Sequence, residues 1–441
     1  MHRCPTVRAL PLVLLGSALA LWACEDDAGG PSGQDAGNLV QDAGGGADGA
    51  GAGDTASVDA GGTDVAAPPD GGTDVAAPPA PPDAADADAP PDAADAGQDA
   101  STDPLAWPVD QDGPFQVGYR VLHTTYTPPG DLPERTIEVH VWYPTAAPTE
   151  ETPTYLGLFP DPNVTVDAPK APSPYPAGHP VLVHSHGHMG FAGNSAELMR
   201  YVATHGWVAV APEHKGNTLL DTPDPRPLAI FLQRVLDVRA ALDLVLTLAP
   251  PDPLAGALDA DRVAMSGHSF GTTTTWAMAG TPFDPVAIQA KCDAGALPDC
   301  SPALVAAFAE VLSDSRPRLF VPMAGGASDL LSWPPTSPVP VLQMTGSLDA
   351  ASAAAVFDSA TSVDLTWADI EGGCHQLFGL GNAVLGDAAC KALPDAEGFA
   401  IVDTLLLAAL RYHVLGDPTV AGILDGTTPV SPRVTLKHKA P

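Results

Sequence analysis

The residues best suited to chemistry lie in the pentapeptide Gly-His-Ser-Phe-Gly at positions 267–271. The apolar run 263–265 before it predicts a buried strand, and the small residues after it, closing on Trp-Ala-Met at 276–278, predict a helix. A serine at the sharp turn between such a strand and helix can act as a nucleophile, because the two glycines permit close approach of the backbone. The start of the helix also directs backbone N–H groups toward a developing oxyanion. The pattern therefore indicates that Ser269 is a nucleophile, with an ordinary glycine turn as the alternative.

A serine hydroxyl needs a base to remove its proton, and the base needs a carboxylate to hold its tautomer. His375 follows the last predicted strand in a Gly-rich loop, and Asp349 follows the strand predicted at 340–345. The chain order Ser269, Asp349, His375 predicts a catalytic triad in which Asp349 orients His375. Asp349 could instead cap a helix predicted at 350–359. Three other carboxylates stay open as the acid: Asp293, Asp369 and Glu371.

The oxyanion formed by such a serine needs backbone N–H donors, one of which belongs to the residue after the nucleophile. That residue is Phe270. The second donor is expected in the loop after the first parallel strand, which reads His-Gly-His at 186–188. We predict that the backbone N–H of His188 is this donor, with Met189 as the alternative.

Three histidines alternate at the end of the strand predicted at 180–184: His184, His186 and His188. Alternating histidines on a strand can bind zinc, so a metal-dependent hydrolase is a rival interpretation. However, the cluster contains no acidic residue, and alternate side chains share a face only while the strand continues. Gly187 indicates that the strand has already ended. We therefore do not expect a metal at these histidines.

These chemical segments must be positioned by the elements around them. Apolar runs predict strands, and apolar residues at helical spacing predict helices. The predicted strands are 113–126, 135–143, 180–184, 207–211, 263–265, 319–323, 340–345 and 362–370; the predicted helices are 195–205, 226–248 and 396–414, and 144–177 is expected to be a surface excursion. Strands that alternate with helices indicate an α/β fold with a mostly parallel sheet covered on both faces. Ser269, Asp349 and His375 all follow strands, at the sheet edge where such folds bind ligands.

Residues 282–316 interrupt this alternation, and we interpret them as an insertion that could cap the active site. The insertion contains Cys292 and Cys300, and Cys374 and Cys390 follow later in the chain. Four cysteines in an exported domain predict two disulfides with three possible connectivities. We expect local pairing, Cys292 with Cys300 and Cys374 with Cys390. Buried free thiols are the alternative.

Residues 1–23 have the features of an export signal, with basic residues at the start and the apolar run 9–23 behind them. This run is too short, and too interrupted by Pro11, to span a bilayer. It ends in Leu-Trp-Ala-Cys, which resembles the bacterial lipobox, although Trp22 replaces the usual small residue. The resemblance implies that Cys24 is lipidated and anchors the protein in the cell envelope, at the outer membrane or the cell surface. Plain cleavage and secretion are the alternative.

Residues 24–103 consist mainly of Ala, Gly, Pro and Asp. From 25 to 103 there are 18 acidic residues, no Lys or Arg, and too few large apolar side chains to offset the entropy cost of ordering. We predict a disordered tether. It contributes part of the net charge of −34, but the domain expected at 104–441 still holds 35 acidic against 17 basic residues. Such an acidic domain argues against a nucleic-acid partner.

Four ordered motifs resemble a known family: Arg-Thr-Ile-Glu-Val-His-Val-Trp-Tyr-Pro from 135, Pro-Val-Leu-Val-His-Ser-His-Gly from 180, Val-Ala-Pro-Glu-His-Lys-Gly-Asn from 210, and Gly-His-Ser-Phe-Gly from 267. Together they look like the platelet-activating-factor acetylhydrolase-like and dienelactone-hydrolase-like branch of the α/β-hydrolases, with bacterial polyester hydrolases as neighbours. The resemblance covers about 115–414. It implies an α/β-hydrolase fold and hydrolysis of carboxylic esters through a serine acyl-enzyme, without metal or cofactor.

The sequence also departs from this family in two places. Dienelactone hydrolases use a cysteine nucleophile, so Ser269 argues against that activity. The acetylhydrolases place their acid earlier after the nucleophile than Asp349, which keeps Asp293 open. The ester itself is not specified: a small molecule, a lipid or a polyester all fit. A non-catalytic surface module on a hydrolase scaffold is the remaining alternative, because fold does not fix function.

Overall fold

The structure, a computed structural model, describes residues 103–310, 312–379 and 392–441. The predicted export signal, the lipidation candidate Cys24 and nearly all of the predicted tether lie outside the described residues. Cys390 lies outside them as well. The fold described below is therefore that of the domain expected at 104–441.

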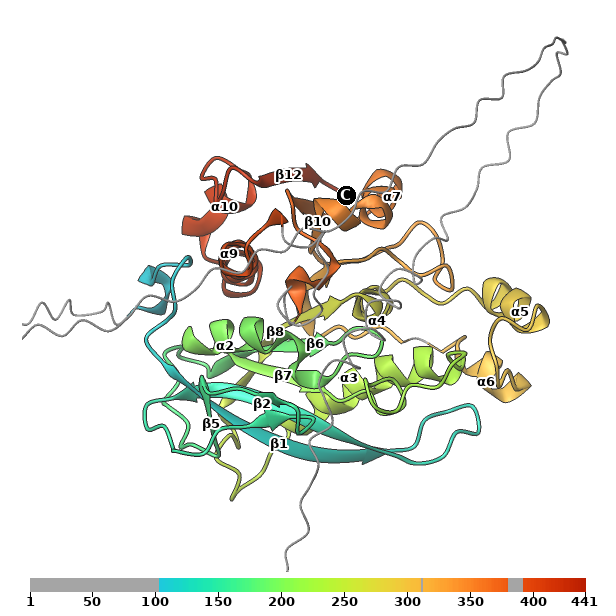
Figure 1. Cartoon of the computed structure of the whole chain (residues 1–441), viewed down its shortest axis with the longest axis horizontal. Coiled ribbons are helices and arrows are strands. Elements are labelled where there is room, and N and C mark those ends of the chain that lie inside the picture. The colour runs from blue at the N-terminus through green and yellow to red at the C-terminus, as the bar shows by residue number, and fades with distance from the viewer. Residues whose placement is uncertain (1–102, 311, 380–391) are drawn as a thin grey trace, which may run out of the picture. The chain divides into compact units, whose positions relative to one another are not determined.

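The centre of the domain is a ten-stranded sheet with the order β12-β11-β10-β9-β8-β6-β7-β2-β1-β5. Every pairing from β7 across to β11 is parallel, whereas β1 with β2, β2 with β7 and β11 with β12 are antiparallel. Figure 1 shows the sheet running from β1 at the bottom of the view to β12 at the top. The strands are β1 (Gln116–Tyr126), β2 (Arg135–Thr145), β5 (Val164–Val166), β6 (His179–Ser185), β7 (Val208–Pro212), β8 (Leu258–His268), β9 (Pro317–Met323), β10 (Val341–Gly346), β11 (Leu365–Ile370) and β12 (Val434–Lys439).

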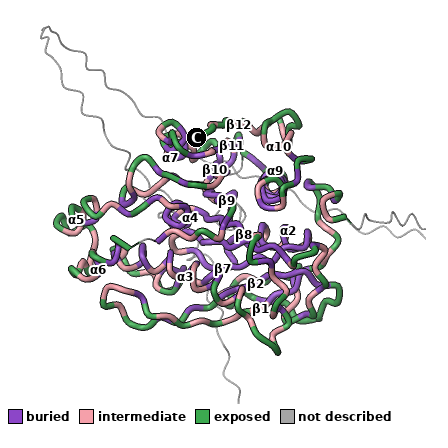
Figure 2. The backbone as a smooth tube through the Cα atoms, turned by 180° about the vertical axis from the view of Figure 1, so that it is seen from behind, coloured by how far each residue is buried: buried purple, intermediate pink, exposed green. Residues whose placement is uncertain are grey.

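Helices cover both faces of this sheet, and alternate residues of each central strand supply the two cores. In β8, for example, Val263 and Met265 belong to the core under α3 and α4, whereas Ala264 belongs to the core under α2 and α9. The central strands are therefore buried on both faces (Figure 2), as a parallel sheet requires. The helices are α2 (Ala196–Thr204), α3 (Ala229–Leu246), α4 (Phe270–Ala279), α5 (Pro285–Asp293), α6 (Pro302–Ala307), α7 (Ala351–Ser359), α9 (Asp395–Ala409) and α10 (Ala421–Leu424).

One of these helices is as long and as apolar as a helix that spans a membrane. The stretch Asp395–Leu415, which is α9 and the π-helical turn after it, has the length and composition to cross a bilayer. Most of it is buried inside the domain, however, where it packs beside α2 in the core on one face of the sheet. Its hydrophobicity is accounted for by this core position.

Two expectations about the elements are wrong. Residues 144–177 are not a plain surface excursion: they contain β3 (Thr154–Tyr155), β4 (Phe159–Pro160) and β5, and they bury Tyr155 and Tyr175. The Tyr155 hydroxyl accepts from the Trp142 indole at 3.0 Å, so this side chain attaches the segment to the core. The proline-rich composition of the segment gave no sign of such a contact. The sheet also does not end with the strand predicted at 362–370, because β12 adds an antiparallel edge beyond β11.

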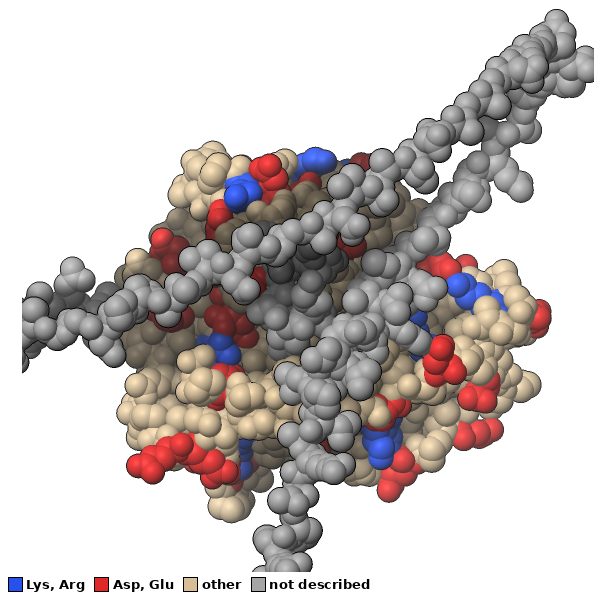
Figure 3. All heavy atoms as spheres, in the orientation of Figure 1, with Lys and Arg blue, Asp and Glu red and all other residues tan. Residues whose placement is uncertain are grey.

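The described surface is acidic without a concentrated basic patch on the face shown in Figure 3. Asp and Glu side chains are spread across this face, and Lys and Arg side chains occur singly among them. The distribution agrees with the excess of acidic residues counted in the sequence.

Candidate active site

Ser269 occupies the sharp turn between β8 and α4. Its backbone has φ 55° and ψ −120°, an unusual conformation for a residue with a side chain. The turn is held from both sides, since the Ser269 N–H donates to the Met323 carbonyl at 2.9 Å and the Thr272 N–H donates to the Ser269 carbonyl at 2.7 Å. Ser269 is half-buried although its neighbours on both sides are buried. The strained turn thus presents the hydroxyl at the surface of the sheet edge.

The two glycines of the pentapeptide are required by space. A Cβ on Gly267 would overlap the carbonyl oxygen of Gly271, and a Cβ on Gly271 would overlap the carbonyl oxygen of Ser185 at the end of β6. Both obstacles are backbone atoms, which cannot rotate away. The absence of side chains lets the start of α4 pack directly against the end of β6.

His375 and Asp349 come from the turns that follow β11 and β10, two strands that are neighbours in the sheet. Asp349 ends the short 3-10 turn Ser347–Asp349 after β10, and His375 begins the turn His375–Phe378 after β11. His375 Nε2 lies 2.7 Å from Ser269 Oγ, and His375 Nδ1 lies 2.6 Å from Asp349 Oδ2. Because a carboxylate only accepts, Nδ1 carries the proton and Nε2 is left to accept from the serine hydroxyl. Hydrogen bonds therefore connect Ser269 to His375 and His375 to Asp349.

The other three carboxylates lie elsewhere. Asp293 is on α5 in the insertion, where it accepts from the Gln289 amide at 2.8 Å. Asp369 is a residue of β11 with one carboxylate oxygen buried and lacking a hydrogen-bond partner within the described residues, and burial raises its pKa. Glu371 is exposed in the turn that follows. Of the four candidates, Asp349 is the one bonded to His375.

The segments that carry the two predicted oxyanion donors both come close to Ser269. Phe270 is the first residue of α4, so its N–H is among the four at a helix start that have no partner inside the helix. The loop after β6 passes directly beside Ser269, since a Cβ on Gly187 would lie 3.1 Å from the Ser269 Cβ. His188 follows in this loop, and its ring meets the Phe270 ring edge-on with centroids 6.2 Å apart. Met189, the alternative donor, has a φ of 53° in the same loop.

Comparison with solved structures identifies the fold. No protein-family model and no curated protein sequence matches this chain. Among solved structures, it is similar to a ferulic acid esterase from Streptomyces cinnamoneus, with 19% sequence identity, a TM-score of 0.52, and coverage of 75% of this chain and 98% of that one. The chain has the α/β-hydrolase fold. The fold class predicted from the sequence is thereby confirmed.

The three histidines of the rival metal site do not converge within this α/β-hydrolase fold. His184 Nδ1 bonds the Ser266 hydroxyl at 2.9 Å, His186 Nε2 accepts from the His214 backbone N–H at 3.1 Å, and His188 Nδ1 accepts from the Asn217 amide at 2.7 Å. In the part of the chain that the structure describes, no group of three His, Cys, Asp or Glu side chains is arranged to hold a metal ion. The alternation in sequence is lost in space because β6 ends at Ser185.

His268 is a residue of the site to which the sequence assigned no role. Its Nε2 donates to the backbone carbonyl of His375 at 2.8 Å, and the two imidazole centroids are 5.1 Å apart. Burial lowers the pKa of His268 to about 3, so the ring stays neutral. It therefore fixes the loop that carries His375 without adding a charge beside the His375 imidazole. Its position directly before Ser269 was the only signal in the sequence.

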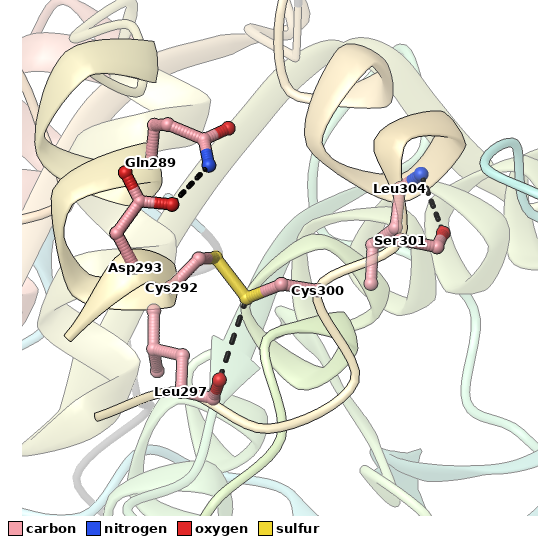
Figure 4. The surroundings of a disulfide bond; sticks show 7 residues. All are labelled: Gln289, Cys292, Asp293, Leu297, Cys300, Ser301 and Leu304. Carbon is pink, nitrogen blue, oxygen red and sulfur yellow. Dashed lines mark hydrogen bonds between the residues drawn. A yellow bond between two sulfur atoms is a disulfide. The ribbon is translucent and has the colours of Figure 1, made fainter. Parts of the chain in front are cut away.

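The insertion contains one of the two predicted disulfides. Cys292 and Cys300 are bonded, with Cα atoms 5.8 Å apart, and join the end of α5 to the approach to α6 (Figure 4). This pairing is confirmed. Cys374 is also disulfide-bonded, and because Cys390 lies outside the described residues, its pairing with Cys390 stays a prediction.

The insertion contacts several neighbouring segments of the domain. The Asp284 N–H donates to the Leu330 carbonyl at 2.8 Å, and Lys291 pairs with Asp329. A Cβ on Gly130, in the turn between β1 and β2, would meet the backbone of Leu304 in α6. These contacts fasten the insertion to the body of the domain, and its role as a cap remains a prediction.

Proposed function

We propose that this protein is a serine-dependent carboxylic ester hydrolase that works through an acyl-enzyme. The observation that carries the proposal is the unbroken line of hydrogen bonds from Ser269 through His375 to Asp349, with distances of 2.7 Å and 2.6 Å. The esterase activity in the name of the similar solved structure supports the same reaction class. The geometry supports the proposal, because Ser269, His375 and Asp349 are arranged as the nucleophile, the base and the group that orients the base are in acyl transfer.

The proposed reaction has two halves. Ser269 Oγ forms a bond to the ester carbonyl carbon while its proton passes to Nε2 of His375, and the carbonyl electron pair moves onto oxygen. When the tetrahedral intermediate collapses, the alcohol leaves with the proton from His375. Water then attacks the acyl-enzyme by the same route and releases the carboxylic acid. Asp349 stabilises the imidazolium that forms in each half.

The oxyanion is proposed to lie between the backbone N–H groups of Phe270 and His188. A fixed N–H donor acts on charge that develops only in the transition state, and removing one such donor costs about 10²–10³-fold in kcat in a well-studied serine protease. The Gly187 contact with Ser269 supports this placement, because it brings the loop of His188 to the nucleophile.

Hydrolysis of p-nitrophenyl esters from acetate to palmitate, together with methyl ferulate, tests the reaction class on the full chain. Ser269→Ala should reduce kcat by about 10⁴-fold or more. Ser359→Ala is the matched control, because Ser359 closes α7 by bonding the Ala355 carbonyl and has no contact with the triad. A folded protein that hydrolyses none of these esters and does not react with a fluorophosphonate would favour the non-catalytic module. Activity abolished by a chelator would favour the metal hydrolase.

We also propose that the protein is exported and anchored through a lipid on Cys24, with the Asp-rich segment as a tether to the enzyme domain. The basic and apolar pattern of 1–23 and the cysteine at its end support this. In a bacterial expression host, labelling with an alkyne fatty acid should mark the wild-type protein in the membrane fraction. Cys24→Ser should remove both the label and the membrane association. A soluble, unlabelled wild-type protein in the medium would indicate plain secretion.

A further inference from the structure

Arg234 is a fully buried cation close to the nucleophile turn. It belongs to α3, and its exposed fraction is 0%. Burial lowers the pKa of Arg234 to about 9, which still leaves the guanidinium charged at neutral pH. A buried charge is costly unless its hydrogen-bonding groups are satisfied. The partners of Arg234 therefore show what its position in the fold provides.

Those partners belong to four different segments. Nη1 donates to the Asn217 side-chain oxygen at 2.7 Å, and Nη2 donates to the Ser185 hydroxyl at 3.0 Å. Nη2 also donates to the backbone carbonyl of His186, and Nε donates to the Thr274 hydroxyl of α4 at 3.3 Å. One rigid, planar group thus connects the end of β6, the loop after it, the loop after β7 and the helix that follows the nucleophile.

Two of these contacts hold the loop 186–188, which carries His188, the second proposed oxyanion donor. The His186 carbonyl belongs to the peptide unit directly before Gly187, so its bond to Arg234 fixes the orientation of the chain there. Asn217 extends the connection, because its amide nitrogen donates to Nδ1 of His188 at 2.7 Å. The loop is therefore held at His186 through its backbone and at His188 through its side chain.

A third contact joins Arg234 to the side chain of Phe270, the other proposed oxyanion donor. The guanidinium carbon of Arg234 lies 4.6 Å from the centre of the Phe270 ring. A cation at this distance from an aromatic ring is attracted to it. Arg234 thus contacts both sides of the proposed oxyanion site, although it is itself buried behind them.

A second layer of buried groups fixes the Ser185 hydroxyl. Arg135 donates through two nitrogens to Asp237, and Asp237 accepts from Nδ1 of His214 at 2.9 Å. His214 Nε2 must then accept from the Ser185 hydroxyl, which leaves the Ser185 oxygen free to accept from Arg234. Burial, with Arg234 and Arg135 nearby, lowers the pKa of His214 well below its usual value, which keeps this arrangement of protons.

We infer that Arg234 is a positioning residue of the oxyanion hole, which sets the loop of His188 against Phe270 at the distance the transition state needs. The inference rests on the proposed function. It assigns Arg234 no contact with substrate. The role depends on the planar guanidinium, whose three nitrogens bond four partners. A lysine at this position would have a single ammonium group to bond the same four.

The test compares Arg234→Lys and Asn217→Ala with wild type in the full chain. Asn217→Ala breaks the connection to His188 but leaves the cation in place, so it tests the same idea if Arg234→Lys does not fold. Arg411→Lys is the matched control. Arg411 is also buried, at 3% exposed, and it bonds Asp417 and the Trp107 carbonyl at 2.7 Å each, neither of which belongs to the site.

Active sites are counted by the endpoint of fluorophosphonate labelling, and kcat and KM for p-nitrophenyl acetate are expressed per labelled site. Arg234→Lys should lower kcat by about 10–100-fold with KM changed little, and should weaken binding of a trifluoromethyl ketone, a tetrahedral mimic, by a similar factor. Asn217→Ala should also lower kcat and weaken binding of the trifluoromethyl ketone with KM changed little, but by about tenfold or less. Arg411→Lys should lower stability and leave kcat per site unchanged.

The result that overturns the inference is wild-type kcat per labelled site in folded Arg234→Lys or in Asn217→Ala. That outcome would give Arg234 a structural role only, and it would leave the esterase proposal intact if Ser269→Ala is inactive. A wild-type protein that neither hydrolyses esters nor reacts with fluorophosphonate would instead overturn the proposed function and this inference with it.

Discussion

The carboxylate of Asp349 lies 2.6 Å from Nδ1 of His375, although 26 residues separate them in the chain. The parallel pairing of β10 with β11 produces this contact. Gly346 is the register partner of Ile370, so the turns that follow the two strands leave the sheet at the same level. Asp349 then comes three residues after one strand and His375 five residues after the other.

Asp349→Asn should lower kcat by about 10⁴-fold, because an amide cannot hold the tautomer that leaves Nε2 of His375 as the acceptor. Asp369→Asn and Asp293→Asn are the controls and should keep near wild-type kcat, since neither side chain bonds His375. Initial rates on p-nitrophenyl acetate decide between them. If Asp293→Asn or Asp369→Asn were the variant that loses activity, the acid would be misassigned.

Gly271→Ala should damage both folding and activity. Its Cβ would overlap the Ser185 carbonyl, so β6 and α4 would have to move apart, at a cost of about 3 kcal/mol in unfolding free energy. The Ser269 turn lies between them, and a shift of about 1 Å there would cost about 100-fold in kcat.

Gly256→Ala separates this effect from backbone strain. Gly256 has a φ of +65° but open space around its Cβ position. The Gly256→Ala variant should lose about 1 kcal/mol of unfolding free energy and keep wild-type kcat. Urea denaturation and kcat per labelled site are the measurements. Equal kcat in Gly271→Ala and Gly256→Ala would show that close packing at the nucleophile turn is dispensable.

Glu213 should make stability depend on pH. Burial raises its pKa to about 8 from 4.5, with Glu138 and Asp221 adding to the effect. Between these two values the folded protein holds a proton that the unfolded chain has released, so the free energy of unfolding falls as pH rises from about 4.5 to about 8 and this contribution is constant above that. Glu213→Gln removes the dependence while its amide oxygen can still accept from the Ala192 N–H.

The measurement is urea denaturation of both proteins from pH 5 to pH 9. The advantage of Glu213→Gln over wild type should grow up to about pH 8 and then level off. Glu150→Gln, at an exposed position, is the control and should follow the wild-type curve. A constant difference across the range would mean that Glu213 is charged in the folded protein throughout.

Removal of the Cys292–Cys300 bond should loosen the insertion locally. The bond closes a loop with a sequence separation of 8, so its loss should favour local opening by about 2 kcal/mol. Limited proteolysis of Cys292→Ser/Cys300→Ser should show faster cleavage between α5 and α6, with kcat on p-nitrophenyl acetate little changed. A fall in the melting temperature of the whole domain without local cleavage would contradict this view of the insertion.

Local patterns in the sequence determined the turn that carries Ser269 and most of the strands. A Gly-x-Ser-x-Gly turn between an apolar strand and a helix depends on neighbours within a few residues, and the structure places Ser269 at φ 55° in that turn. Chain order was sufficient to place His375 and Asp349 after successive strands at one edge of the sheet. The edge strand β12, Val-Thr-Leu-Lys-His-Lys, was missed because its polar composition carries little strand signal.

Only the tertiary structure decided which groups contact one another. The sequence favours Asp349 but leaves Asp293, Asp369 and Glu371 open, and the register of β10 on β11 brings Asp349 to His375. The connections of Arg234 are likewise invisible in the sequence, because its partners come from β6, α4 and two loops that meet only when the sheet has formed. Side-chain contacts between distant segments depend on packing and register, whereas the turn that carries Ser269 depends on its own residues.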